Sequence, residues 1–102
     1  MKIEVLYFAG CPNYLPAVDR LRTVLASEGL RAELIRIEVK DDSAARTLKF
    51  FGSPTIRVNG LDVDVTARQV SETGFACRRY PDGLPSVEMI RAAITEARAQ
   101  SR

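Results

Sequence analysis

Residues 2–14, with the sequence KIEVLYFAGCPNY, contain the change from strand to helix that decides the fold. Residues 2–8 are rich in β-forming residues and nearly all apolar after Glu4, as in a central strand that is covered on both faces of its sheet. The helix begins either after Asn13, as its N-cap, or at Pro12. Cys11 stands between the strand and the start of this helix. From there the apolar spacing becomes that of one helix face, formed by Tyr14, Val18, Leu21 and Leu25.

Two further elements are expected in the middle of the chain. Residues 31–39 predict a second strand. A short helix is expected over residues 44–51, after a cap at Asp42 or Ser43. The residues of this helix that point inward are Ala45, Leu48 and Phe51.

The pattern then predicts a hairpin and a last helix. Asn59-Gly60 is a strong signal for a two-residue hairpin turn. It joins a strand over residues 56–58 to a strand over residues 61–65. Pro85-Ser86 opens the last helix, whose buried stripe is formed by Val87, Ile90, Ala93, Ile94 and Ala97.

This order of elements, β-α-β-α-β-β-α, predicts an α/β fold with a four-stranded mixed sheet flanked by helices. The length of 102 residues fits one domain, residues 1–102. Residues 66–85 are expected to form an irregular inserted loop before the last helix, with one helical turn within residues 66–73. Loops of this length in a small domain are usually functional or disordered. This loop contains Cys77 and the pair Arg78-Arg79.

The composition argues against several classes of function. The net charge is only +2, so charge gives no support to binding of nucleic acid or a membrane surface. The chain has no histidine, which removes the usual general base and any Cys–His catalytic pair. It has no signal-peptide pattern and no membrane span, which needs about 20 apolar residues, so we expect a cytoplasmic protein. In a reducing cytosol, two cysteines are more commonly reactive, metal-ligating or buried than joined in a structural disulfide.

Three motifs occur in an order that resembles the thioredoxin and glutaredoxin superfamily. Cys11-Pro12-Asn13-Tyr14 follows the first strand, at the place of the family's Cys-x-x-Cys, and Ser53-Pro54-Thr55 opens the third strand, where the family has a cis-proline. The Asn59-Gly60 hairpin comes next. The resemblance covers about residues 2–65 and 86–98 and implies a thioredoxin-like fold. It also implies that the bond between Ser53 and Pro54 is cis, and that the strand edge beside it pairs with an extended substrate chain.

The resemblance further implies a thiol–disulfide oxidoreductase or thiol-dependent reductase in which Cys11 is the nucleophile. A helix N-terminus presents unpaired amides and the positive end of the helix dipole, and both favour a reactive thiolate. Tyr14 stands where a dithiol enzyme has its second cysteine, so Cys77 becomes the candidate resolving thiol. The candidate substrate-binding residues are Pro12, Tyr14, Ser53, Pro54, Thr55 and Arg78.

The expected partner is a protein or small molecule that contains a disulfide or a thiol. We expect no cofactor, and glutathione or thioredoxin would serve as the external reductant.

Other interpretations of the same residues stay open. Two thiolates also suit a soft metal such as mercury, although the sequence assigns no metal site. A thioredoxin-like fold without redox activity would be a binding module, in which either cysteine is an inert residue. Arg78 and Arg79 are more commonly a solvated pair than an anion clamp. Asp62 and Asp64 alternate on a predicted strand and are expected to face water.

Overall fold

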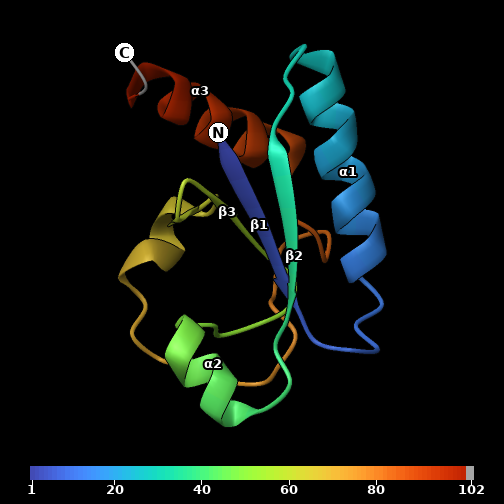
Figure 1. Cartoon of the computed structure of the whole chain (residues 1–102). Coiled ribbons are helices and arrows are strands. Elements are labelled where there is room, and N and C mark those ends of the chain that lie inside the picture. Colours follow the sequence, from blue (N-terminus) through green and yellow to red (C-terminus); the bar gives the residue numbers. More distant parts are fainter. Residues whose placement is uncertain (101–102) are drawn as a thin grey trace.

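The central element of the fold is β1 (Lys2–Tyr7), which lies between two neighbours in a four-stranded sheet of order β2-β1-β3-β4. β1 runs parallel to β2 (Glu33–Glu38) and antiparallel to β3 (Thr55–Val58). β4 (Leu61–Asp62) pairs antiparallel with β3. The computed structural model describes residues 1–100, and Figure 1 shows this arrangement. The prediction of a four-stranded mixed sheet is therefore confirmed.

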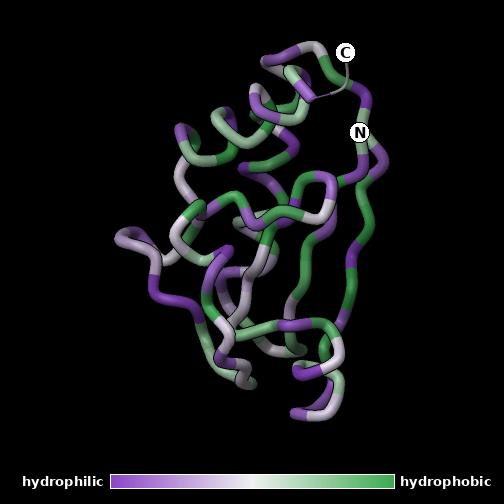
Figure 2. Tube along the Cα trace, turned by 90° about the vertical axis from the view of Figure 1, so that its left-hand side faces the viewer, coloured by the Kyte–Doolittle hydropathy of each residue, from purple (hydrophilic) through white to green (hydrophobic). Residues whose placement is uncertain are grey.

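Three α-helices flank the sheet, namely α1 (Tyr14–Ser27), α2 (Asp42–Leu48) and α3 (Val87–Gln100) (Figure 1). Hydrophobic and hydrophilic residues are interleaved along the chain in Figure 2, as expected where helices bury only one face. Within residues 1–100, no helix combines the length and the apolar character needed to cross a membrane. The larger core lies between the sheet and helices α1 and α3, and it includes Val18, Leu21, Leu25, Ile56, Ile90 and Ile94.

β1 is buried on both faces of the sheet. Successive side chains of a strand point to opposite faces. Ile3 and Val5 belong to the larger core, whereas Leu6 belongs to a smaller cluster with Val39, Ala45 and Phe50. Ala45 comes from α2, so this helix covers the face opposite α1 and α3. Burial on both faces accounts for the apolar run of β1 that follows Glu4.

The start of α1 agrees with one of the two predicted positions. The helix begins at Tyr14 with Asn13 as its N-cap. Pro16 then occupies the third helical position, where its missing N–H costs no intrahelical hydrogen bond. The amide of Tyr14, the first residue of the helix, donates a hydrogen bond to the carbonyl of Cys11 at 3.3 Å. Cys11 therefore lies in the turn just before the helix rather than in its first turn.

The boundaries of α2 differ from the prediction at both ends. Its N-cap is Asp41, whose carboxylate accepts a hydrogen bond from the amide of Ala44 at 2.7 Å. The helix ends at Leu48 because Lys49 adopts the left-handed conformation, with φ 55°. Phe51 therefore lies outside the helix, and its neighbour Phe50 fills the core with no exposed surface.

Two strands are shorter than predicted. β2 covers Glu33–Glu38 rather than residues 31–39. β4 ends at Asp62 because Asp64 caps a 3-10 helix, η1 (Val65–Gln69), by accepting a hydrogen bond from the amide of Thr66 at 3.1 Å. The predicted Asn59-Gly60 turn is confirmed, since both residues have positive φ angles, of 51° and 84°.

The inserted loop over residues 66–85 is irregular apart from η1 and one β-bridge, in agreement with the prediction. It is nevertheless tied to the core by backbone hydrogen bonds. The amide of Gly74 donates to the carbonyl of Phe50 at 3.0 Å, and residues 76–78 pair with Ser53. The loop is thus a fixed part of the fold beside the start of β3.

Candidate functional site

The loops after β1 and before β3 lie at the same end of the sheet. The two strands are antiparallel, and Leu6 near the end of β1 pairs with Thr55 at the start of β3. The amide of Phe8 donates to the hydroxyl of Ser53 at 3.4 Å. The loop that contains Cys11 is therefore held against the residue that precedes Pro54.

Cys11 is a free thiol with 8% of its surface exposed. Its amide donates to the carbonyl of Phe8 at 3.2 Å, which closes a turn directly after β1. Gly10 allows the backbone to form this turn. Its φ angle is +87°, a value that residues with a side chain rarely adopt. The thiol is therefore positioned by the turn between β1 and α1, and only a small part of it faces solvent.

Cys77 is a free, exposed thiol on a backbone that pairs with Ser53. The amide of Ser53 donates to the carbonyl of Ala76 at 2.8 Å, and the amide of Arg78 donates to the carbonyl of Ser53 at 2.9 Å. The ring of Phe75 also stacks on the ring of Phe8, with centroids 5.0 Å apart. The structure thus brings the two cysteine-containing loops to the same end of the sheet.

Ser53 joins the two loops. Its hydroxyl accepts a hydrogen bond from Phe8 on the Cys11 side, and its backbone pairs with residues 76–78 on the Cys77 side. It has no exposed surface. The backbone edge that the resemblance assigns to a substrate chain is therefore occupied by the protein's own loop.

The bond between Ser53 and Pro54 is cis, as the resemblance implied. The carbonyl of Pro54 accepts a hydrogen bond from the hydroxyl of Tyr80 at 2.8 Å. The hydroxyl of Thr55 donates to the carbonyl of Gly52 at 2.6 Å. Pro54 and Thr55 are both buried, so they shape the backbone of the site and offer little surface to a ligand.

Pro12 and Tyr14, the two other candidates from the first motif, occupy different environments. Pro12 is exposed at the tip of the turn. Tyr14 is half-buried and stacks on Tyr7, with ring centroids 3.6 Å apart and an interplanar angle of 5°. Partial loss of water around the phenol of Tyr7 raises the pKa of Tyr7, and its hydrogen bond to Tyr14 raises this pKa further. Tyr14 therefore secures the start of α1 against β1.

Arg78 is buried, with 6% of its surface exposed, and is not part of a solvated pair. Its guanidinium lies 2.7 Å from a carboxylate oxygen of Asp62 and 3.5 Å from one of Asp64. It also lies between the rings of Phe51 and Tyr80, 4.5 and 4.6 Å from their centroids. The charge of Arg78 is thus already balanced inside the protein.

The expected exposure of the acidic residues on β4 is therefore wrong for Asp62, which is only 8% exposed. The two aspartates and the arginine lie far apart in sequence and meet because the loop folds back over β4. The opposite charges of Asp62 and Arg78 were the only signal of this pair in the sequence. Arg79 is exposed and has no ion-pair partner among the described residues.

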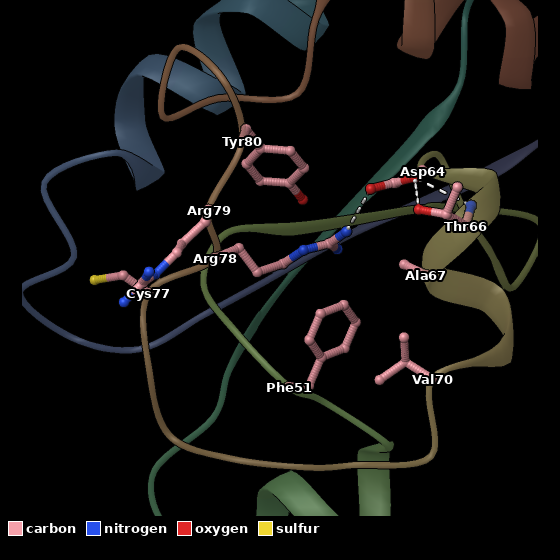
Figure 3. Close-up of a pocket in the computed structure, with 9 residues that line it drawn as sticks. All are labelled: Phe51, Asp64, Thr66, Ala67, Val70, Cys77, Arg78, Arg79 and Tyr80. Atoms are coloured by element: carbon pink, nitrogen blue, oxygen red, sulfur yellow. Dashed lines mark hydrogen bonds and ion pairs between the residues drawn. The ribbon is translucent and has the colours of Figure 1, made fainter.

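A cavity of about 320 Å³ adjoins Arg78 (Figure 3). Its walls combine the apolar side chains of Phe51 and Val70 with the polar side chains of Asp64 and Thr66. In Figure 3 the sulfur of Cys77 points away from the centre of the cavity. The cavity therefore lies behind the thiol, on the side where Arg78 anchors the loop.

Burial also affects the phenol at the edge of this cavity. Loss of water raises the pKa of Tyr80 well above its ordinary value of 10.0. Its hydroxyl therefore stays protonated and donates to Pro54 at neutral pH.

Residues 1–100 contain no group of three or more Cys, Asp or Glu side chains placed to hold a metal ion. No protein-family model, no curated protein and no solved structure matches this chain.

Proposed function

We propose that this chain is a thioredoxin-like thiol–disulfide oxidoreductase in which Cys11 is the nucleophile and Cys77 is the resolving thiol. The observation that carries the proposal is the position of Ser53. Its hydroxyl is bonded to the loop of Cys11, and its backbone is paired with Cys77 and its neighbours. Both thiols are free and belong to loops at one end of the sheet.

The reaction begins with attack of the Cys11 thiolate on a substrate disulfide. A bond forms between the sulfur of Cys11 and one substrate sulfur, and the substrate disulfide breaks. The second substrate sulfur leaves as a thiolate and takes a proton from water. Cys77, as a thiolate, then attacks the sulfur of Cys11 and releases the first substrate sulfur. The substrate gains two electrons, and the protein ends with a disulfide between Cys11 and Cys77.

An external dithiol or two molecules of a monothiol complete the cycle. They transfer two electrons to the disulfide of the protein and are themselves oxidised to a disulfide. Thioredoxin and glutathione are reductants of these two kinds. The chain's own contribution is to hold the two loops in place, through Ser53 and through the anchoring of Arg78.

Exposed residues at this end of the sheet set the contacts for a substrate. Pro12 and Arg79 are exposed on the two loops, as are Phe75 and Cys77. We propose that Pro12 and Phe75 contact apolar parts of the substrate, and that Arg79 attracts an anionic group. Ser53, Pro54, Thr55 and Tyr14 act by fixing the backbone around the thiols.

Mass spectrometry after mild oxidation tests this function. The purified protein is treated with an equimolar amount of a small disulfide, which accepts the two electrons, and its thiols are mapped beside those of Cys11→Ser and Cys77→Ser. We expect one intramolecular disulfide between Cys11 and Cys77, which thioredoxin or glutathione reduces. Cys77→Ser should instead trap a mixed disulfide between Cys11 and a small substrate disulfide, whereas Cys11→Ser, which lacks the nucleophile, should not.

A relocated cysteine provides the matched control. The double variant Cys77→Ser with Ala76→Cys keeps two cysteines and moves the second one by one residue, away from the position that bridges to Ser53. It should form the intramolecular disulfide far more slowly. Equal rates in the control would contradict a positioned resolving thiol. Two thiols that stay free in the wild-type protein would contradict the redox function and favour a non-catalytic binding module.

A further inference from the structure

A second cavity lies between the C-terminal end of α2 and the segment that follows η1. It encloses about 530 Å³. Figure 1 shows the gold segment after η1 running toward α2. Within the described part of the chain, no acidic side chain lines this cavity. Its lining includes three cationic and three neutral polar residues, which are Arg46, Lys49 and Arg68 and then Gln69, Ser71 and Thr73.

Two of these cations have no counter-ion among the described residues. Arg46 and Lys49 are exposed and form no ion pair within residues 1–100. Arg68 is different, because its guanidinium donates to both carboxylate oxygens of Glu96, at 3.0 and 2.7 Å. The positive charge of the cavity therefore comes from Arg46 and Lys49.

A smaller adjoining cavity of about 190 Å³ adds a third cation. It shares Lys49 and Arg68 with the larger cavity and is also lined by Arg57. The guanidinium of Arg57 donates to the carbonyl of Lys49 at 3.0 Å and has no carboxylate partner among the described residues. Asp62 lines this smaller cavity, but its carboxylate is paired with Arg78.

This concentration of charge is not explained by the helix that it adjoins. A cation in the last turn of α2 interacts favourably with the helix dipole, which accounts for Arg46. Lys49 follows the helix in a left-handed conformation, and Arg57 belongs to β3. Glu72 belongs to the segment after η1 but does not line either cavity. Arg46 and Lys49 thus line the larger cavity and Arg57 lines its smaller neighbour, and a bound anion would offset their mutual repulsion.

We propose that the larger cavity binds the phosphate or diphosphate group of a small molecule. Arginine and lysine are the side chains that bind such oxyanions most strongly, and hydroxyl and amide groups complete their coordination. Ser71, Thr73 and Gln69 supply these groups. The volume lies in the range of small-molecule sites. Neither cysteine lines this cavity or its neighbour, so the site is independent of the thiol chemistry.

A titration with inorganic pyrophosphate tests the site. Amide chemical shifts of the ¹⁵N-labelled full chain are followed by NMR at an ionic strength of about 0.15 M, where the Debye length is about 8 Å. We expect saturable shifts that are concentrated at Lys49 and over residues 69–73. The double variant Arg46→Gln with Lys49→Gln should raise the dissociation constant about tenfold or more, because two charge-assisted contacts are lost. The single variant Arg46→Gln should have an intermediate effect.

The matched control removes the same charge elsewhere. Arg22 and Arg31 are exposed, form no ion pair within the described residues and do not line the cavity. Arg22→Gln with Arg31→Gln should change the dissociation constant by less than about twofold, because distant charges are screened. Equal weakening in both double variants would overturn the proposal. Shifts that do not saturate, or that spread over other basic surfaces of the wild-type protein, would also overturn it.

Discussion

Arg78 places a full positive charge in an environment with little water. Its guanidinium is balanced by Asp62 and Asp64 and is covered by two aromatic rings. Gly52 makes room for it, since a Cβ atom at this position would meet the Cγ of Arg78. A buried ion pair contributes little net stability, but removing one partner leaves the other charge uncompensated. The backbone next to Cys77 is therefore held in place by a buried ion pair, and removal of either partner of this pair would destabilise the fold.

We expect Arg78→Met to lower the free energy of unfolding by about 3 kcal/mol, because Asp62 then stays buried without its partner. The double variant Arg78→Met with Asp62→Asn should lose less than the single variant. Urea unfolding followed by circular dichroism measures both. Arg79→Met is the control, since Arg79 is exposed and unpaired among the described residues, and it should stay within about 0.5 kcal/mol of the wild type. Equal losses at the two positions would contradict this account.

At the scale of single residues, the sequence predicts helix starts and turns better than ion pairs between residues that are distant in the chain. The helix start after Asn13 was one of two positions that the neighbouring residues predicted, and the positive φ angles of Asn59 and Gly60 follow from the Asn-Gly turn. The burial of Asp62 depends on Arg78, which lies on a loop without a regular pattern. An alternating aspartate on a strand is usually solvated, so nothing local indicated that a cation would cover it.

At the scale of elements, η1 is fastened to α3 by a single charged contact. The guanidinium of Arg68 makes two hydrogen bonds to Glu96 and one to the carbonyl of Asp62. The two hydrogen bonds from Arg68 to Glu96 hold the pKa of Glu96 below its ordinary value of 4.5. They therefore connect the start of the inserted loop to the last helix of the fold.

This contact predicts a pH-dependent contribution to stability. Because the pKa of Glu96 is lower in the folded state, its contribution is present above pH 4.5 and is lost as the pH falls through the folded pKa. We therefore expect Glu96→Gln to be less stable than the wild type at pH 7, and this difference to be smaller at pH 3. Chemical unfolding at both pH values measures the difference, with Glu72→Gln as the control, because Glu72 is exposed and has no ion-pair partner among the described residues. A difference that stays constant with pH would contradict the role of this carboxylate.

The ends of elements were harder to predict than their order. Strand and helix periods gave the β-α-β-α-β-β-α order, because each buried face repeats its apolar residues along the chain. The end of α2 depends on the left-handed Lys49, and lysine carries no signal for that conformation. The short β4 depends on Asp64 capping η1 instead of continuing the strand. In both cases one backbone conformation decided a boundary that hydrophobic periodicity cannot resolve.

At the scale of the whole molecule, the proposed disulfide would join the first turn of the chain to its last loop. A cross-link between Cys11 and Cys77 restricts a long stretch of the unfolded chain, and a loop of that length is worth about 4 kcal/mol in the chain-entropy estimate. We expect the oxidised protein to unfold at a higher urea concentration than the reduced protein. Cys77→Ser under the same oxidant should show no such increase. An oxidised form with unchanged or lower stability would mean that the native backbone does not accommodate the bond.

Only part of the candidate site could be predicted from the sequence. The sequence indicated both cysteines as candidate site residues and the cis bond before Pro54, because the motifs of the resemblance occur in a fixed order along the chain. It could not place the inserted loop, since residues 70–84 have no helical or strand period. The cavity next to Arg78 and the basic cavity beside α2 are both lined by residues of this loop. Both could be found only from the folded structure.

Ser53 holds two loops that are far apart in sequence. In kinetic terms, each cysteine meets the other at an effective concentration that the fold determines and that dilution of the protein does not change. Closure of the proposed disulfide would then be a first-order process, whereas cross-linking between two molecules slows in proportion to concentration. The protein would thus respond to oxidants as a self-contained unit, however few copies are present.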